Sequence, residues 1–278
     1  MLNSKTAGTI HAEMMMVRAG GWSGVFVVVE GPDDEGYWRT HLKVNPEAIV
    51  IAEGVINLRD CMRALPPPLV GSVCAIADQD FRHYLPVDPF NGCVDVFFYD
   101  EGFLETFLLN TSAFQKLLGV HAEHTKLIAF LAAVKHHTVY AHLRDIASVF
   151  GRLRVLNEIH KWGICFERKF TVYKYVDETS WVLDERRLIT DVALATGLTP
   201  VMLKSACDVI GMRGSLRLVH GHDALKVLAI GLKKRLGCAR TSQDRLLSDL
   251  KLAFDSSCLP RKRLARQLRT WAGTRRLL

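Results

Sequence analysis

Acidic side chains directly follow several of the apolar runs in the first 110 residues of the sequence. They are Glu30, Asp78 and Asp80, and Asp100, with Glu105 one turn into the segment after Asp100. In open α/β sheets the functional crevice lies at the carboxyl ends of the strands, so we expect these carboxylates to converge on one edge. Their mutual repulsion would protonate some of them unless a divalent cation neutralises the group. An all-oxygen donor set favours Mg²⁺ or Mn²⁺ over zinc, and such a site can support phosphoryl transfer.

A plainer interpretation exists for each acid taken alone, because short acidic side chains commonly cap helices or sit in solvated turns. The prediction of a metal site therefore depends on several of these acids occurring together. A strand ending in Glu30 and Gly31 is followed by Asp34, and a later strand ends in the pair Asp78 and Asp80. Asp34 itself is interpreted as a helix cap or as a weaker metal ligand.

The elements that must position these acids alternate between apolar runs and amphipathic segments, which is typical of a doubly wound α/β domain with a mostly parallel sheet. The expected strands are Val25–Glu30, Ala48–Ala52, Ser72–Ala77 and Val94–Tyr99. The expected helices run from Asp33 or Asp34 to about Lys43, over Asn57–Leu65 and over Phe103–Leu109. The solid apolar character of the first strand indicates burial on both faces of the sheet.

After about Thr111 the strand pattern fades and a mainly helical half is expected. Trp162–Val176 is left open as two short strands or a loop. We therefore expect an α/β domain over residues 20–110 and a mainly helical domain over residues 111–278. His222 and Asp223 are interpreted as the start of a helix over Asp223–Leu236, with a metal or base role as the alternative.

Positive charge is concentrated near the C-terminus. The chain has a formal net charge of +7, yet from Gly211 onward it has 16 Lys and Arg against 4 Asp and Glu. This asymmetry indicates a polyanionic partner such as a nucleic acid, although a solvated helix face, an acidic protein partner or a membrane surface would fit the same charge. The cations of the last segment are Arg261, Lys262, Arg263, Arg266 and Arg269, followed by Arg275 and Arg276.

Composition excludes several classes of protein. Of the 278 residues, 49% are hydrophobic, which is typical of a globular chain and too apolar for a disordered one. The seven cysteines are scattered without a CxxC pair, and we see neither a secretory signal nor an 18-residue apolar run, so we expect a cytoplasmic protein without a membrane span. No GxxxxGK[ST] loop is present, which argues against nucleotide hydrolysis by this chain.

Four segments together resemble the TOPRIM domain of topoisomerases, primases and OLD-type nucleases, and more closely a bacterial TOPRIM-like family. They are VFVVVEGPDD (25–34), VCAIADQDF (73–81), FFYDEGFLETFLLN (97–110) and VHGHDALKVLAIGL (219–232). The resemblance implies a Rossmann-like TOPRIM sheet, with Glu30 as the catalytic carboxylate and Asp78 and Asp80 as Mg²⁺ ligands. It further implies that Glu105 binds or supports a second metal and that Asp100 lies behind the ligands. The sequence departs from the family in having no obvious lysine just after Asp80, and Arg82 and His83 are the nearby candidates to stabilise phosphate charge.

The same family includes the effector subunit (AriB) of the PARIS anti-phage defence systems, which is paired with an ABC-type ATPase (AriA). The resemblance therefore implies a toxin that the ATPase holds silent and that, once released, forms a homodimer and cleaves host transfer RNA or other RNA. The basic C-terminal segment would suit contacts to the RNA backbone. Two alternatives stay open: an OLD-like DNA nuclease, and a non-catalytic regulatory or nucleic-acid-binding subunit of an ATPase complex.

Overall fold

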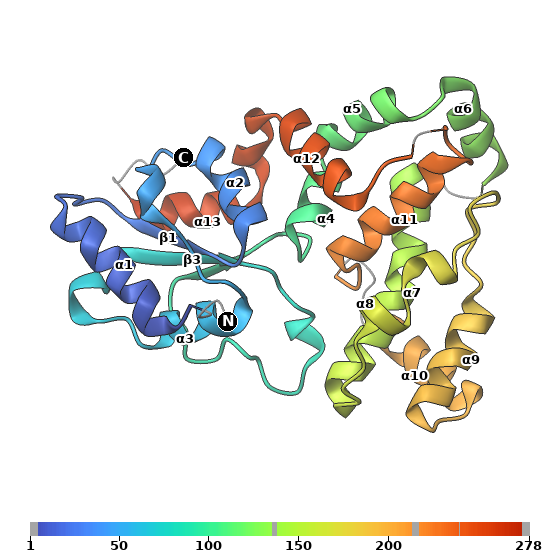
Figure 1. Ribbon diagram of the computed structural model, residues 1–278, viewed down its shortest axis with the longest axis horizontal. Helices are drawn as coiled ribbons and strands as arrows, with labels where there is room; N and C mark the ends of the chain where they lie inside the picture. The colour runs from blue at the N-terminus through green and yellow to red at the C-terminus, as the bar shows by residue number, and fades with distance from the viewer. Residues whose placement is uncertain (1–4, 135–137, 213–216, 239, 274–278) are drawn as a thin grey trace. The chain divides into compact units, whose positions relative to one another are not determined.

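The computed structural model describes the chain except residues 1–4, 135–137, 213–216, 239 and 274–278, so Arg275 and Arg276 lie outside the described residues. The chain forms two compact units (Figure 1). Unit 1 comprises Met1–Gln79, Val87–Leu104 and Asp255–Leu278, and unit 2 comprises Asp80–Pro86 and Glu105–Phe254. This division differs from the expected boundary near Thr111, since the C-terminal segment belongs with the N-terminal sheet.

Unit 1 is built on a parallel sheet, which confirms the expected α/β class with a mostly parallel sheet. Its four strands lie in the order β2-β1-β3-β4, and every neighbouring pair is parallel. They are β1 (Phe26–Val29), β2 (Ile49–Ile51), β3 (Val73–Ala77) and β4 (Val96–Phe98). The central strands β1 and β3 are buried along their whole length, whereas β4 at the edge is only half-buried. Parallel sheets require covering layers on both faces, and the apolar runs of the central strands reflect that requirement.

Helices cover both faces of this sheet (Figure 1). On one face, α1 (Ala7–Ala19) and α3 (Val55–Arg63) pack with the side chains of alternate strand residues into one hydrophobic core. On the other face lie α2 (Pro32–His41) and α13 (Arg263–Ala272). Short 3-10 turns occur at Pro46–Ala48, Pro67–Leu69 and Ser256–Arg261.

Helix α1 has no counterpart among the elements expected from the sequence. Thr6 and Thr9 form a capping box that fixes its first turn. Ile10 and Met14, four residues apart, bury their side chains in the core below the sheet. With only two buried positions in 13 residues, its apolar stripe is narrow, which is why the hydrophobic pattern did not reveal it.

Unit 2 is mainly helical, as expected. Its helices are α4 (Leu104–Leu109, which starts at the last residue before the unit), α5 (Ser112–His121), α6 (His124–Ala133), α7 (Val139–His160), α8 (Phe166–Lys169), α9 (Glu185–Thr196), α10 (Pro200–Met212), α11 (Gly221–Lys233) and α12 (Gln243–Ala253). Further 3-10 turns occur at Arg82–Tyr84 and Val172–Lys174. Residues Trp162–Val176, for which the sequence allows two short strands or a loop, form α8 and a 3-10 turn. An isolated β-bridge between Val176 and Leu183 joins this segment to the following loop.

Two glycines allow the close packing of helices in unit 2. A Cβ on Gly151 of α7 would lie 1.5 Å from the carbonyl oxygen of Leu218, just before α11. A Cβ on Gly231 of α11 would lie 2.4 Å from the indole of Trp181, which is fully buried and donates its Nε1–H to the Val227 carbonyl. Both positions therefore require glycine for steric reasons.

No single helix among the described residues is both long and apolar enough to cross a membrane, although α9 and α10, bent by 108° at their junction, would pass that test as a pair.

The substitution Gly151→Ala should destabilise unit 2, because backbone atoms of Leu218 occupy the space that the methyl group needs. We expect a loss of about 1–3 kcal/mol in the free energy of unfolding, measured by chemical denaturation. Gly119→Ala on α5 is the matched control, since a Cβ there meets nothing within 4 Å. The control should gain about 0.5–1 kcal/mol from helix propensity, and equal effects of the two changes would contradict the packing argument.

Candidate active site

Glu30 and Asp78 lie at the same edge of the sheet. Strands β1 and β3 are parallel neighbours, and Val29 lies opposite Ile76 in their register. Glu30 follows Val29 directly, and Asp78 comes two residues after Ile76. The two acids therefore follow neighbouring strand ends at the same edge, as the sequence predicts, and paired strands lie about 4.8 Å apart.

Asp34 joins this edge through a buried chain of hydrogen bonds. The indole Nε1–H of Trp38 donates to the Tyr99 hydroxyl at 2.8 Å, and that hydroxyl donates to Asp34 Oδ1 at 2.6 Å. Burial raises the pKa of the Tyr99 phenol well above its usual range, and the negative charges of Asp34 and Asp78 raise it further. Tyr99 therefore stays protonated and holds the Asp34 carboxylate in place.

Sequence reasoning missed both aromatic residues. The available indication was general: a Tyr or Trp inside an apolar segment usually finds a hydrogen-bond partner when it is buried. Tyr99 ends the fourth expected strand and Trp38 lies on the first expected helix, but their pairing across 61 residues leaves no local pattern.

The loop after β3 is held by hydrogen bonds to the segment that follows β4. Asp78 Oδ1 accepts a hydrogen bond from the Leu104 N–H at 3.3 Å. Gln79 is 2% exposed, and its side-chain amide donates to the Tyr99 carbonyl at 2.6 Å. Its backbone N–H donates to the Gly102 carbonyl, also at 2.6 Å. These bonds fix the backbone that carries Asp78.

Asp100 has a structural role that the sequence only partly indicated. Its carboxylate accepts hydrogen bonds from the backbone N–H groups of Arg263 and Leu264 at 2.6 and 2.8 Å, at the start of α13. An acid at a helix N-terminus satisfies unpaired N–H groups and interacts favourably with the helix dipole. Beside it, Glu101 pairs with Lys262 at 2.7 Å, and both side chains are largely buried. Lys262, which we expected to contact nucleic acid, is thus engaged within unit 1.

Asp80 lies in unit 2, where the chain takes an unusual course. Asp80 and Phe81 both have left-handed backbone conformations, with φ of 42° and 59°. Such angles are uncommon for residues other than glycine and occur often at functional sites. Burial raises the pKa of Asp80 to about 6, and the negative charge of Glu158 adds to this shift. Arg82 follows on a 3-10 turn and is half-buried.

Glu105 is packed against the first turn of α11 within unit 2. Its side chain is buried, and a Cβ on Gly221 would lie 2.0 Å from its Oε2 atom. His222 Nδ1 lies 3.6 Å from Glu105 Oε1. The side chain of Glu105 thus occupies the space that the missing side chain of Gly221 leaves.

The segment around His222 and Asp223 begins α11, in agreement with the plainer of the two interpretations. Asp223 is 2% exposed and accepts two hydrogen bonds from the Arg154 guanidinium, at 2.7 and 3.0 Å. Burial lowers the pKa of His220 to about 3, and the positive charge of Arg154 lowers it as well. The imidazole of His220 is therefore neutral near neutral pH.

The predicted acids thus fall into two sets. Glu30, Asp34 and Asp78 are gathered at the sheet edge of unit 1, whereas Asp80 and Glu105 belong to unit 2. The meeting of the two sets stays a prediction. Within the described part of the chain, no three His, Cys, Asp or Glu side chains form a ready-made metal-binding group. The all-oxygen chemistry of the sheet-edge acids nevertheless fits Mg²⁺, which is usually held by only one or two carboxylates while water and substrate supply the remaining ligands.

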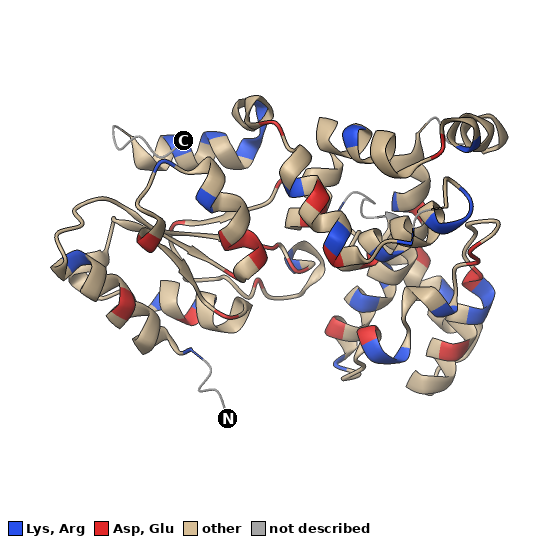
Figure 2. Cartoon of the chain, turned by 45° about the horizontal axis from the view of Figure 1, so that its top comes forward, with Lys and Arg blue, Asp and Glu red and all other residues tan. Residues whose placement is uncertain are grey.

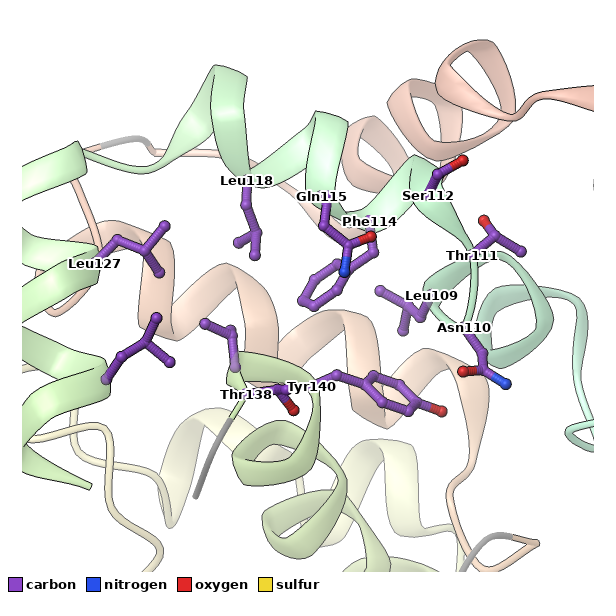
Figure 3. A pocket seen from close by; sticks show the side chains of 12 residues that line it. Leu109, Asn110, Thr111, Ser112, Phe114, Gln115, Leu118, Leu127, Thr138 and Tyr140 are labelled. Atoms are coloured by element: carbon purple, nitrogen blue, oxygen red, sulfur yellow. The ribbon is translucent and has the colours of Figure 1, made fainter. Parts of the chain in front are cut away.

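Unit 2 also contains a pocket of about 630 Å³ among α5, α6 and the start of α7 (Figure 3). Its walls are mainly apolar, and the side chains of Asn110, Gln115 and Tyr140 add polar groups. Among the residues that the structure describes, its lining contains no acid, histidine or cysteine.

Comparisons with known proteins leave the family open. No protein-family model matches the chain, and neither the curated proteins nor the solved structures contain a match.

Replacing Tyr99 with Phe should destabilise unit 1, because it removes the hydroxyl that joins Trp38 to Asp34. We expect a loss of about 1–3 kcal/mol in the free energy of unfolding, since the buried Trp38 and the half-buried Asp34 each lose a hydrogen bond. Tyr173→Phe is the control, because Tyr173 is 52% exposed. Urea denaturation measures both, and a neutral Tyr99→Phe would refute the role given to this hydroxyl.

His220 should make unit 2 sensitive to acid. Its pKa is about 3 in the folded chain against 6.5 as the ordinary value, so unfolding takes up a proton once the pH falls below about 6.5. Stability from this group is complete above that pH and declines by about 1.4 kcal/mol per pH unit as the pH falls toward 3. His220→Gln should flatten the pH dependence of unfolding between pH 7.5 and 5, whereas His124→Gln, at an exposed position, should leave it as in the wild type.

Proposed function

We propose that this protein is a Mg²⁺-dependent nuclease of the TOPRIM type. The observation that supports the proposal most is the alignment of β1 with β3, which sets Glu30 and Asp78 at neighbouring carboxyl ends of a parallel sheet. That edge is where open α/β sheets carry their functional groups. A buried Tyr99 that keeps Asp34 oriented beside them adds a third acid to the same edge.

Each acid has a defined task in this proposal. Glu30 and Asp78 would hold Mg²⁺, with Asp34 close by and with Asp80 and Glu105 as the further ligands that the family resemblance implies. When bound, the metal would stabilise negative charge on the phosphate oxygens during displacement. Glu30 is also the group we assign to accept a proton from the attacking water.

The substrate is proposed to be RNA, with transfer RNA as the first candidate. The excess of cations from Gly211 onward supports a polyanionic substrate. Following the family resemblance, we propose that the chain acts as the toxin of an anti-phage system, held silent by an ABC-type ATPase and active as a homodimer after release. A DNA nuclease of the OLD type and a non-catalytic subunit are the outcomes that the next experiment separates from this proposal.

Glu30→Gln and Asp78→Asn should each lower the cleavage rate by about 100-fold or more, since each removes a charged ligand without changing the shape of the side chain. Asp33→Asn is the matched control. Asp33 lies in the first turn of α2 beside Asp34, but its side chain is exposed. The purified protein is incubated with labelled transfer RNA and with plasmid DNA, each with Mg²⁺ and with EDTA.

Cleavage of transfer RNA that EDTA abolishes and Asp33→Asn retains would support the proposal. Cleavage of the plasmid alone would identify a DNA nuclease. Toxicity in cells that persists unchanged in Glu30→Gln would contradict the assignment of this edge as the active site.

A further inference from the structure

Helix α13 lies along the edge strand of the sheet in unit 1. Its N-terminus is fixed at Asp100, two residues beyond the end of β4. Near its C-terminus, Trp271 contacts the ring of Phe97 in β4, with ring centroids 6.2 Å apart. The helix therefore starts at the edge that carries Glu30 and Asp78 and runs back along β4, away from that edge.

One side of α13 is buried and the other is cationic. Leu264, Ala265, Leu268 and Ala272 pack inward. The exposed positions carry Arg263, Arg266 and Arg269, and Arg261 precedes the helix. From Arg261 to the end, the sequence contains no acid. Figure 2 shows the basic bands along this helix.

A shallow groove of about 420 Å³ follows the helix where it meets β4. Arg263, Arg266, Gln267 and Thr270 line it from α13, together with the half-buried ring of Trp271. Asp95 and Phe97 line it from the strand side, so this groove has two arginines against one acid. Cations, neutral hydrogen-bond donors and an aromatic ring in one groove are the components of sites for single-stranded nucleic acid.

We propose that the groove along α13 binds the phosphate backbone of a single-stranded nucleic acid and leads the strand to the acidic edge of the sheet. This inference rests on the proposed function, since that edge is its destination. The ten-residue helix is about 15 Å long, and a stacked strand advances about 3.4 Å per nucleotide. The groove thus accommodates roughly four nucleotides, with Arg263 and Arg266 on successive phosphates and Trp271 beside a base.

The anchoring of α13 favours this occupant over an acidic protein surface. Asp100 and the Glu101–Lys262 ion pair hold the start of the helix to the sheet, so the arginines are presented in a fixed row. Lys262 is engaged in that ion pair and is left out of the binding set. The side-chain amide of Gln267 supplies neutral donors suited to phosphate or sugar oxygens, which are the commonest protein contacts to nucleic acid, whereas the Thr270 hydroxyl donates to the Arg266 carbonyl.

The test measures binding separately from cleavage. The full chain carrying Glu30→Gln, in EDTA, is titrated into fluorescein-labelled 12-nucleotide oligoribonucleotide, its deoxy counterpart and a 12-base-pair duplex, and anisotropy is recorded at several salt concentrations. Arg263→Gln with Arg266→Gln is the test variant, since both arginines line the groove and both positions are exposed. Arg168→Gln with Arg186→Gln removes the same charge from exposed positions of α8 and α9 and serves as the control.

The test variant should weaken binding of the single strands at least tenfold at 0.1 M salt, and the slope of log affinity against log salt should fall by about 1.4, at about 0.7 per lost phosphate contact. The control pair should change neither quantity. Tighter binding of the ribo- than of the deoxyoligonucleotide would assign the groove to RNA, and the reverse to DNA.

Equal losses in the test and control variants would overturn the inference, because net charge alone would then explain them. Preference for the duplex would overturn it as well, and so would unchanged binding in the test variant, which would leave an acidic protein as the occupant. Loss of cleavage in Glu30→Gln, measured separately, tests the proposed function and not the groove.

Discussion

The parallel pairing of β1 with β3 is the constraint on which the rest of unit 1 depends. Two strands that run in the same direction need a crossover between them, and the crossover helices cover the faces that the apolar strands cannot expose to water. The same pairing brings the ends of both strands, and the turn residues that follow, to one edge. That edge therefore carries Glu30 and Asp78 at neighbouring strand ends, and the mutual repulsion of two close carboxylates is the reason a cation is proposed there. The Trp38–Tyr99–Asp34 chain then ties the first crossover helix to the segment after β4.

Much of this sheet was predictable because its determinants are local. Val25–Glu30 is apolar at every position before the acid, as burial on both faces demands, and the strand that forms, Phe26–Val29, is buried throughout. The placement of Glu30 and Asp78 at one edge followed from strand direction alone. The support of Asp34 by Tyr99 was not predictable, since a hydrogen bond across 65 residues has no local pattern.

In the C-terminal segment, the many arginines make the buried stripe of α13 hard to recognise from the sequence. Its arginines suggested a basic segment of the helical half, yet Leu264, Leu268 and Ala272 recur every four residues and form the buried stripe of α13. The sequence therefore shows the amphipathic pattern of this helix but does not show which element its buried stripe packs against. That partner is the sheet unit more than 160 residues earlier, and the cap that fixes the helix is Asp100. Likewise, the approach of Glu105 to Gly221 is a steric fit between distant segments that only coordinates reveal.

The discontinuity of unit 1 has a consequence for how the protein is made. Asp255–Leu278 belongs to this unit, but Glu105–Phe254 must be translated first. At about 5–20 residues per second, the ribosome needs on the order of ten seconds to pass that insertion. During this delay β4 emerges without the helix that flanks it, so the nascent chain exposes a bare strand that chaperones would have to shield from pairing with other chains. The groove proposed for nucleic acid likewise forms only after α13 has been translated, so it is completed later than the sheet on which it lies.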